Sequence, residues 1–218
     1  MFSDRREAGR QLARRLMKLK SERPIVLALP RGGVPVAFEV AQALEAPLDV
    51  VMVRKIGAPS HPELGLGAVV DGADPKLVFN DEVIAFVDPD PAYLEAEKRR
   101  QLEEIERRKR LYRGDRPQPP VEGRLVIVID DGIATGGTVK AVLRALAAAK
   151  PARRVLAVPV APRESIAALR PEADDIVCLA MPEPFFAVGN YYRDFRQTTD
   201  EEVVELLQRA AARGAGQL

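Results

Sequence analysis

An apolar run that ends in two carboxylates is the feature that most constrains this chain. Leu125 to Ile129 are five consecutive β-favouring apolar residues, which is typical of a strand buried on both faces in the middle of a parallel sheet. Asp130 and Asp131 follow directly where that strand ends. Open α/β sheets bind their ligands at the carboxyl ends of the strands, so the run predicts a ligand site beside these two acids.

A turn of small residues comes after the acids and predicts a phosphate site. It precedes a helical run over 139–149 and consists of Ala134, Thr135, Gly136, Gly137 and Thr138. Glycines let backbone N–H groups converge, hydroxyls add donors, and the helix N-terminus adds positive potential. The spacing matches neither a nucleotide P-loop nor the Gly-x-Gly-x-x-Gly pattern. The alternative is an ordinary strand, turn and capped helix.

The acids and the turn together narrow the class of ligand. A phosphate site would repel two carboxylates unless these faced hydroxyl groups or a cation. A phosphorylated sugar with a vicinal diol, bound together with Mg²⁺, satisfies both requirements, because Asp130 and Asp131 can then face the diol and the metal.

A second strand runs into glycines and a helix. The strand predicted over 24–29 is followed by Arg31, Gly32 and Gly33 and by a helix over 34–44. This is the same arrangement with an arginine at the turn, and it indicates a second anion site. A plain turn is the alternative. Strands that alternate with helices in this way predict an α/β fold with a parallel sheet and right-handed connections.

A basic pair follows the third predicted strand. That strand covers 48–53, and Arg54 and Lys55 follow it directly. Two fixed cations can stabilise a leaving group that gains negative charge. The alternative is a solvated basic turn.

Three segments fall outside the alternation of strands and helices. Ser60 to Gly67 has no periodicity and holds the only histidine, His61; the segment is a candidate lid, although His61 can equally be a surface residue. The polar helix predicted over 90–112 is supported by i,i+4 Glu–Arg pairs and indicates an exposed arm or a dimer contact. Residues 181–198 gather aromatic side chains that can either stack on a planar ring or fill a satellite core.

The bulk composition limits the partners. The 218 residues carry a net charge of +1, which gives no reason to expect nucleic acid or an anionic membrane as a partner. No apolar run approaches the roughly 20 residues that a membrane span requires, and the N-terminus lacks the apolar core of a signal peptide. A single cysteine, Cys178, excludes an intramolecular disulfide. We therefore expect one cytoplasmic domain over 1–218.

The string from Leu125 to Thr138 resembles the phosphoribosyl-diphosphate (PRPP) signature of type I phosphoribosyltransferases. That signature is an apolar strand, two acids, two spacer residues and a small-residue turn that ends in Thr. Gly132 departs from it, because the family usually has an aliphatic residue or Ser there. Arg54 and Lys55 are similar to the basic pair of the adenine and orotate members. The resemblance implies transfer of ribose-5-phosphate from PRPP to a ring nitrogen, with release of diphosphate.

The resemblance also implies a fold and a role for each candidate residue. The fold is an open, mostly parallel twisted sheet flanked by helices, with a small hood of C-terminal or N-terminal residues, roughly 181–198. Asp130 and Asp131 hold the ribose hydroxyls, partly through Mg²⁺, and act in catalysis with Lys55. The 5-phosphate lies on the turn from Ala134 to Thr138. A cis peptide is expected near Arg31–Gly32, and the diphosphate contacts are Arg31, Gly32, Gly33, Arg54 and Lys55.

The acceptor is the least defined part of this interpretation. The hood resembles that of purine enzymes, in which an aromatic residue covers the base, and Phe186 and Val188 are the candidate base contacts. Hypoxanthine-type members carry a proton-accepting acid where this chain has Ala134, so we expect an unusual nitrogenous base. A PRPP-sensing regulatory protein without catalysis is the main alternative, and a sugar-phosphate hydrolase is a third. We also expect a homodimer.

Overall fold

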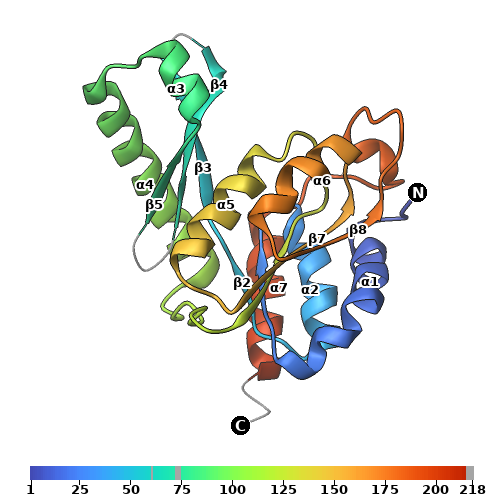
Figure 1. Ribbon diagram of the computed structural model, residues 1–218. Helices are drawn as coiled ribbons and strands as arrows, with labels where there is room; N and C mark the ends of the chain where they lie inside the picture. The colour runs from blue at the N-terminus through green and yellow to red at the C-terminus, as the bar shows by residue number, and fades with distance from the viewer. Residues whose placement is uncertain (60, 72–74, 215–218) are drawn as a thin grey trace.

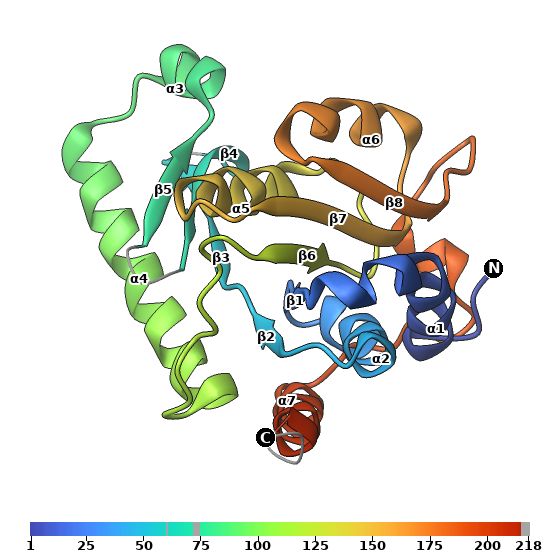
Figure 2. The same ribbon diagram turned by 60° about the horizontal axis from the view of Figure 1, so that its bottom comes forward.

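The computed structural model describes residues 1–59, 61–71 and 75–214. Five parallel strands form its central sheet in the order β2-β1-β6-β7-β8, which Figure 2 shows side by side. The predicted open parallel sheet flanked by helices is therefore confirmed. In this spatial order the strands are Leu48–Val50, Ile25–Ala28, Leu125–Ile129, Arg153–Val160 and Asp175–Ala180.

The two faces of this sheet are covered by different helices. On one face, Val26 and Ile127 pack with α1 (Arg5–Leu16), α2 (Gly33–Leu44) and α7 (Asp200–Gly214). On the other face, Ile25 and Val126 pack with α5 (Gly137–Ala148) and α6 (Arg163–Leu169). Because successive side chains of a strand point to opposite faces, the apolar run of β6 is buried on both sides, as predicted.

A second, antiparallel sheet stands beside the first. It contains β3 (Val53–Ala58), β4 (His61–Val70) and β5 (Lys76–Phe79) in that order. With α3 (Asp81–Val87) and α4 (Pro91–Arg113) it forms a projection from the body that we call the lobe (Figure 1). The lobe packs on α5 through its strands and on α7 through α4. The short helices η1, η2 and η3 span Met17–Glu22, Arg170–Glu172 and Val188–Tyr191.

The lobe corrects two sequence predictions. The strand predicted over 48–53 ends at Val50, and a new strand starts at Val53, so Arg54 and Lys55 lie inside a strand rather than in a turn. The predicted lid is mostly strand β4, which begins at His61; Ser60 lies outside the described residues. Glycines hid this strand. A Cβ atom at Gly67 would lie 2.4 Å from the carbonyl oxygen of Val78, so the neighbouring backbone requires glycine there.

Helix α4 matches the predicted polar helix but is not a detached arm. One of its faces packs on β3 and α7 and buries Gln101, Ile105 and Tyr112. Of the predicted i,i+4 pairs, Glu104–Arg108 is present at 2.7 Å, whereas other ion pairs on this helix have the i,i+3 spacing.

None of the helices in the described part of the chain combines the length and the apolar character needed to cross a membrane.

Candidate active site

Two motifs about a hundred residues apart in sequence meet at the carboxyl edge of the central sheet. β1 and β6 are parallel neighbours, with Ala28 opposite Ile129, so the loops that follow them start at the same edge. A Cβ atom added at Gly32 would lie 2.1 Å from Oδ2 of Asp131, and one at Gly33 would lie 3.0 Å from Cα of Asp130. Glycines are therefore required in this loop because the two acids fill the space that a side chain would need.

The loop after β1 also holds the cis peptide and Arg31. The cis bond joins Pro30 and Arg31, one bond before the Arg31–Gly32 bond near which it was predicted. The Nη1 atom of Arg31 lies 3.6 Å from Oδ1 of Asp200 at the start of α7. The predicted diphosphate loop thus carries its arginine beside an acid from a distant part of the sequence.

The two acids after β6 differ in their surroundings. Oδ1 of Asp130 accepts a hydrogen bond from the backbone N–H of Asp131 at 2.9 Å. Burial, followed by repulsion from Asp131, raises the pKa of the Asp130 carboxyl well above its usual value. Oδ2 of Asp131 instead accepts from Nε of Arg5 at 2.7 Å, and its carbonyl oxygen accepts from the hydroxyl of Tyr192 at 2.5 Å. Asp130 is thus desolvated, whereas Asp131 is paired with Arg5.

Arg5 is a site residue that the sequence did not reveal. Its guanidinium lies 4.0 Å from the ring centroid of Phe195, and its Nη1 donates to the carbonyl oxygen of Arg196 at 2.8 Å. Arg5 begins α1, a helix whose pattern shows only an amphipathic face. No local signal links it to Asp131, because the two residues are 126 positions apart.

The donor set of the site fits one kind of metal. The described residues contain no group of three or more His, Cys, Asp or Glu side chains that could hold an ion. Mg²⁺ needs no such cage, since it is commonly bound through one or two carboxylates together with substrate phosphates. Asp130 and Asp131 are two such carboxylates at one strand end, so the residues present fit Mg²⁺ that arrives with a phosphorylated substrate.

The predicted phosphate turn is open to solvent. Ala134, Thr135, Gly137 and Thr138 are exposed, and α5 begins at Gly137. Gly136 has φ +79°, a left-handed conformation that glycine adopts readily. The hydroxyl of Ser165 holds the turn by donating to the carbonyl oxygen of Ala134 at 2.5 Å. Free amides at a helix N-terminus and two exposed hydroxyls form a suitable anion site.

The basic pair of β3 points in two directions. Arg54 shares the face of Ile56, which packs with Ile105 of α4, and Nε of Arg54 donates to Oε1 of Gln101 in α4 at 3.0 Å. Lys55 shares the opposite face with Val53, which packs in the cluster that contains α5. The structure therefore does not bring Arg54 and Lys55 together. Only Lys55 lies on the face of the lobe that packs on the helix of the phosphate turn.

The hood combines the N-terminus of the chain with residues 181–198. The N–H of Phe2 donates to the carbonyl oxygen of Tyr191 at 2.8 Å, and the rings of Phe2 and Tyr192 lie 5.4 Å apart. Val188 packs beside Gly132, where an added Cβ atom would lie 2.4 Å from Cγ1 of Val188. This contact accounts for the departure at Gly132, because the hood occupies the space of an aliphatic side chain.

The aromatic residues of the hood divide between the two interpretations given above. Phe185 stacks on Tyr191 at 5.3 Å, and Tyr192 stacks on Phe195 at 5.1 Å, so these rings build a small core. Phe186 is 76% exposed and can receive a planar ligand. His61 is exposed on β4.

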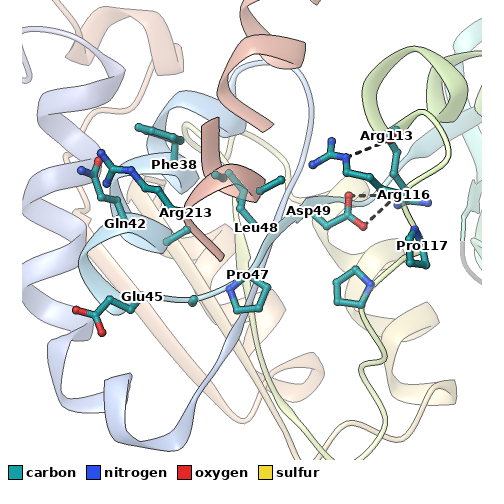
Figure 3. Close-up of a pocket in the computed structure, with 15 residues that line it drawn as sticks. Phe38, Gln42, Glu45, Pro47, Leu48, Asp49, Arg113, Arg116, Pro117 and Arg213 are labelled. Atoms are coloured by element: carbon teal, nitrogen blue, oxygen red, sulfur yellow. Dashed lines mark hydrogen bonds and ion pairs between the residues drawn. The ribbon is translucent and has the colours of Figure 1, made fainter. Parts of the chain in front are cut away.

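A cavity of about 820 Å³ lies away from all the predicted site residues. Its walls come from the ends of α2, α4 and α7 and from the start of β2, so it lies at the amino end of the sheet (Figure 3). Arg113 and Asp49 form an ion pair of 3.0 Å at its edge. Oδ2 of Asp71 lies 3.7 Å from Nη2 of Arg113, and burial raises the pKa of Asp71 to about 6.

Comparison with known proteins identifies the family of this chain. The family model described as the phosphoribosyl transferase domain matches residues 5–194. Two curated relatives from Mycobacterium tuberculosis strains, each named "putative phosphoribosyl transferase", are 50% identical over 210 residues and cover 96% of this chain. The chain spans about half of their length, 47%.

Solved structures are similar to this chain in fold. The crystal structure of TT1426 from Thermus thermophilus is similar with a TM-score of 0.84 and 45% identity, covering 96% of this chain and 98% of that one. A protein from Aquifex aeolicus, at 13% identity and a TM-score of 0.51 over 85% of this chain and 78% of that one, is similar in fold alone. With its family model matched from Arg5 to Asp194, the chain belongs to the phosphoribosyl transferase domain family.

Proposed function

We propose that this protein transfers ribose-5-phosphate from PRPP to a nitrogenous base and releases diphosphate. One observation carries the proposal: the glycines after Arg31 lie against Asp130 and Asp131, next to an open phosphate turn. A single edge of the sheet therefore offers acids for the sugar, amides for the 5-phosphate and an arginine for the diphosphate.

The proposed reaction exchanges one bond at C1 of the ribose. The bond from C1 to the diphosphate oxygen breaks with its electron pair leaving on the diphosphate, and the lone pair of a ring nitrogen forms the new bond to C1. The proton that this nitrogen carries is released to water. The transition state has oxocarbenium character. Asp130 and Asp131 hold the two ribose hydroxyls, close to the ring that gains positive charge. Mg²⁺, when bound by these acids, offsets the negative charge that builds on the diphosphate.

The phosphate groups lie at opposite ends of the substrate. Backbone amides and hydroxyls from Ala134 to Thr138 bind the 5-phosphate. Arg31 and the amides of Gly32 and Gly33 bind the diphosphate, and Lys55 reaches it from the lobe. Arg54 joins them only after its guanidinium leaves Gln101, to which it is hydrogen-bonded at 3.0 Å.

The acceptor is a planar nitrogenous base that lies under the hood. Val188 packs beside Gly132 and exposed Phe186 covers the ring. The side chain of Ala134 cannot accept a proton, so the acceptor nitrogen does not depend on an acid at that position. We therefore propose a base other than hypoxanthine or guanine.

The test is diphosphate release from PRPP and Mg²⁺ across a panel of nucleobases and other nitrogen heterocycles. We expect release with at least one acceptor and loss of release in the Asp131→Asn variant. Strong turnover of hypoxanthine or guanine would contradict the proposed acceptor class. Tight PRPP binding without release under every acceptor would instead support the PRPP-sensing alternative.

We further propose that the protein works as a cytoplasmic homodimer. Light scattering of the purified chain measures its mass directly, and a monomer of 23.9 kDa would contradict the dimer.

A further inference from the structure

We propose that helix α4 controls both arginines assigned to the diphosphate: Tyr112, acting through Asp200, orients Arg31, and Gln101 holds Arg54 until it is released to the diphosphate. The inference rests on the proposed function and adds positioning residues to it. Tyr112, Asp200 and Gln101 do not follow from the sequence motifs, and the proposed mechanism places none of them on the substrate.

Arg31 faces a carboxylate that is itself held in place. Nη1 of Arg31 lies 3.6 Å from Oδ1 of Asp200, and the same oxygen accepts a hydrogen bond from the hydroxyl of Tyr112. Asp200 is the first residue of α7, where the helix dipole favours a negative charge. Because Tyr112 is only 2% exposed, its packing fixes the hydroxyl. The start of α7 and the hydrogen bond from Tyr112 thus fix the Asp200 carboxylate that Arg31 contacts.

The hydroxyl of Tyr112 stays protonated and so remains a hydrogen-bond donor to Asp200. Burial, and then the hydrogen bond to Asp200, raise the pKa of the phenol to about 12. The phenol therefore keeps its proton at neutral pH, and Asp200 remains the acceptor. A carboxylate with one oxygen shared by a phenol and an arginine is more restrained than one paired with an exposed arginine alone.

Arg54 is held at a second point on the same helix. Oε1 of Gln101 accepts from Nε of Arg54 at 3.0 Å, while Nε2 of Gln101 donates to Oε1 of Glu97 at 2.6 Å. The bond to Glu97 fixes which end of the buried Gln101 amide faces the arginine. Nearby, the hydroxyl of Tyr93 donates to the carbonyl oxygen of Gly57 at 2.9 Å, so the strand that carries Arg54 is attached to α4 twice.

The two contacts are joined by one unbroken helix. Gln101 and Tyr112 both lie within α4, and a rise of about 1.5 Å per residue puts their Cα atoms roughly 16 Å apart along the axis. Arg54 belongs to the lobe, whereas Arg31 belongs to the central sheet and contacts α7. α4 therefore sets the position of the lobe cation relative to the cation of the glycine loop.

The experiment measures diphosphate affinity in the full chain by calorimetry with Mg²⁺ present. We expect Tyr112→Phe, which keeps the buried ring, to weaken diphosphate binding about tenfold, the effect of one hydrogen bond to a charged group. Gln101→Leu, which releases Arg54 from the 3.0 Å hydrogen bond, should strengthen diphosphate binding about threefold, and weaker binding in this variant would contradict the role of Gln101. Glu106→Gln is the control on the same helix, because it breaks the ion pair of Glu106 with Lys109 at 2.7 Å without touching either arginine contact, and its affinity should stay within about twofold of wild type.

A double-mutant cycle separates positioning from a general structural effect. In the Arg31→Ala background, Tyr112→Phe should cause no further loss, because the group that it positions is gone. Asp200→Glu should retain more affinity than Asp200→Ala. An undiminished effect of Tyr112→Phe without Arg31, or wild-type affinity in Tyr112→Phe, would overturn the inference. Failure of the wild-type chain to bind either diphosphate or PRPP would instead overturn the proposed function.

Discussion

The carboxyl edge of the central sheet and the lobe present their charged residues in different ways. At the edge, the loop that carries Arg31 meets Asp131 through Gly32, because parallel register brings the ends of β1 and β6 to one place. In the lobe, Arg54 and Lys55 are adjacent in sequence but lie on opposite faces of β3. Side chains of adjacent residues in a strand point to opposite faces, whereas the loops that follow two parallel neighbouring strands lie at the same edge of the sheet. Two basic residues that are adjacent in sequence therefore do not by themselves define a binding site.

The largest effect should come from Asp130 at the sheet edge. Asp130→Asn removes the carboxylate that we propose to bind the ribose hydroxyls, and we expect the rate of diphosphate release to fall at least about 100-fold. The same change should raise thermal stability at neutral pH, because burial and the charge of Asp131 raise the pKa of the Asp130 carboxyl in the folded state.

The size of this stability effect depends on pH in a defined way. Below the ordinary carboxyl pKa of 3.8, Asp130 is protonated in both the folded and the unfolded chain, so Asp130→Asn should change little. As pH rises above that value, the unfolded chain loses the proton first, and wild-type stability declines until the raised folded-state pKa is passed. The gain from Asp130→Asn should therefore grow with pH. Melting curves between pH 4 and pH 8 measure it, and a loss of stability at pH 8 would show that the charge is structural.

The second effect compares the two cations of β3. Lys55→Ala should raise the barrier to diphosphate departure by about 2–4 kcal/mol, by analogy with the loss of one oxyanion donor. Arg54→Ala should affect the rate less and the melting temperature more, because Arg54 is bonded to Gln101 and attaches β3 to α4 within the lobe. Single-turnover rates and melting curves for both variants decide between these roles. Equal rate losses would mean that Arg54 leaves Gln101 and acts with Lys55.

The sheet edge could be predicted from sequence and much of the lobe could not. Leu125 to Ile129 has no polar interruption, and its burial on both faces followed from that pattern. The glycines near Asp131 were correctly assigned to the turn, although their close contact with the acid became visible only in the structure. A short strand was predicted over 67–70, but the first part of strand β4 was missed because Pro62, Gly65 and Gly67 interrupt its alternation. Gly67 is required by the backbone of β5. Arg5 and Asp200 were missed because long-range contacts leave no local pattern.

The third effect concerns the contact between the hood and the sheet edge. Gly132→Ala places a Cβ atom 2.4 Å from Cγ1 of Val188, and such overpacking should reduce the free energy of unfolding by about 1–3 kcal/mol. Val188→Ala removes the opposing methyl group, so the double variant should recover part of this loss. Denaturant unfolding of the two single variants and the double variant measures the coupling. Strict additivity would mean that the hood does not rest on Gly132 in solution.

The smallest effect tests whether Arg5 competes with a cation for Asp131. Arg5→Gln removes a partly buried ion pair of 2.7 Å, and we expect a loss of about 1 kcal/mol in the free energy of unfolding. The freed carboxylate of Asp131 should bind Mg²⁺ with PRPP more tightly, because no protein cation then neutralises it. Arg6→Gln is the matched control, since Arg6 lies 4.0 Å from Glu39 on the same helix and away from the acids. Magnesium titrations by calorimetry compare the variants. Weaker Mg²⁺ binding in Arg5→Gln than in Arg6→Gln would make Arg5 a group that holds Asp131 in its binding position rather than a competitor, and the N-terminal helix would then be part of the sheet-edge site itself.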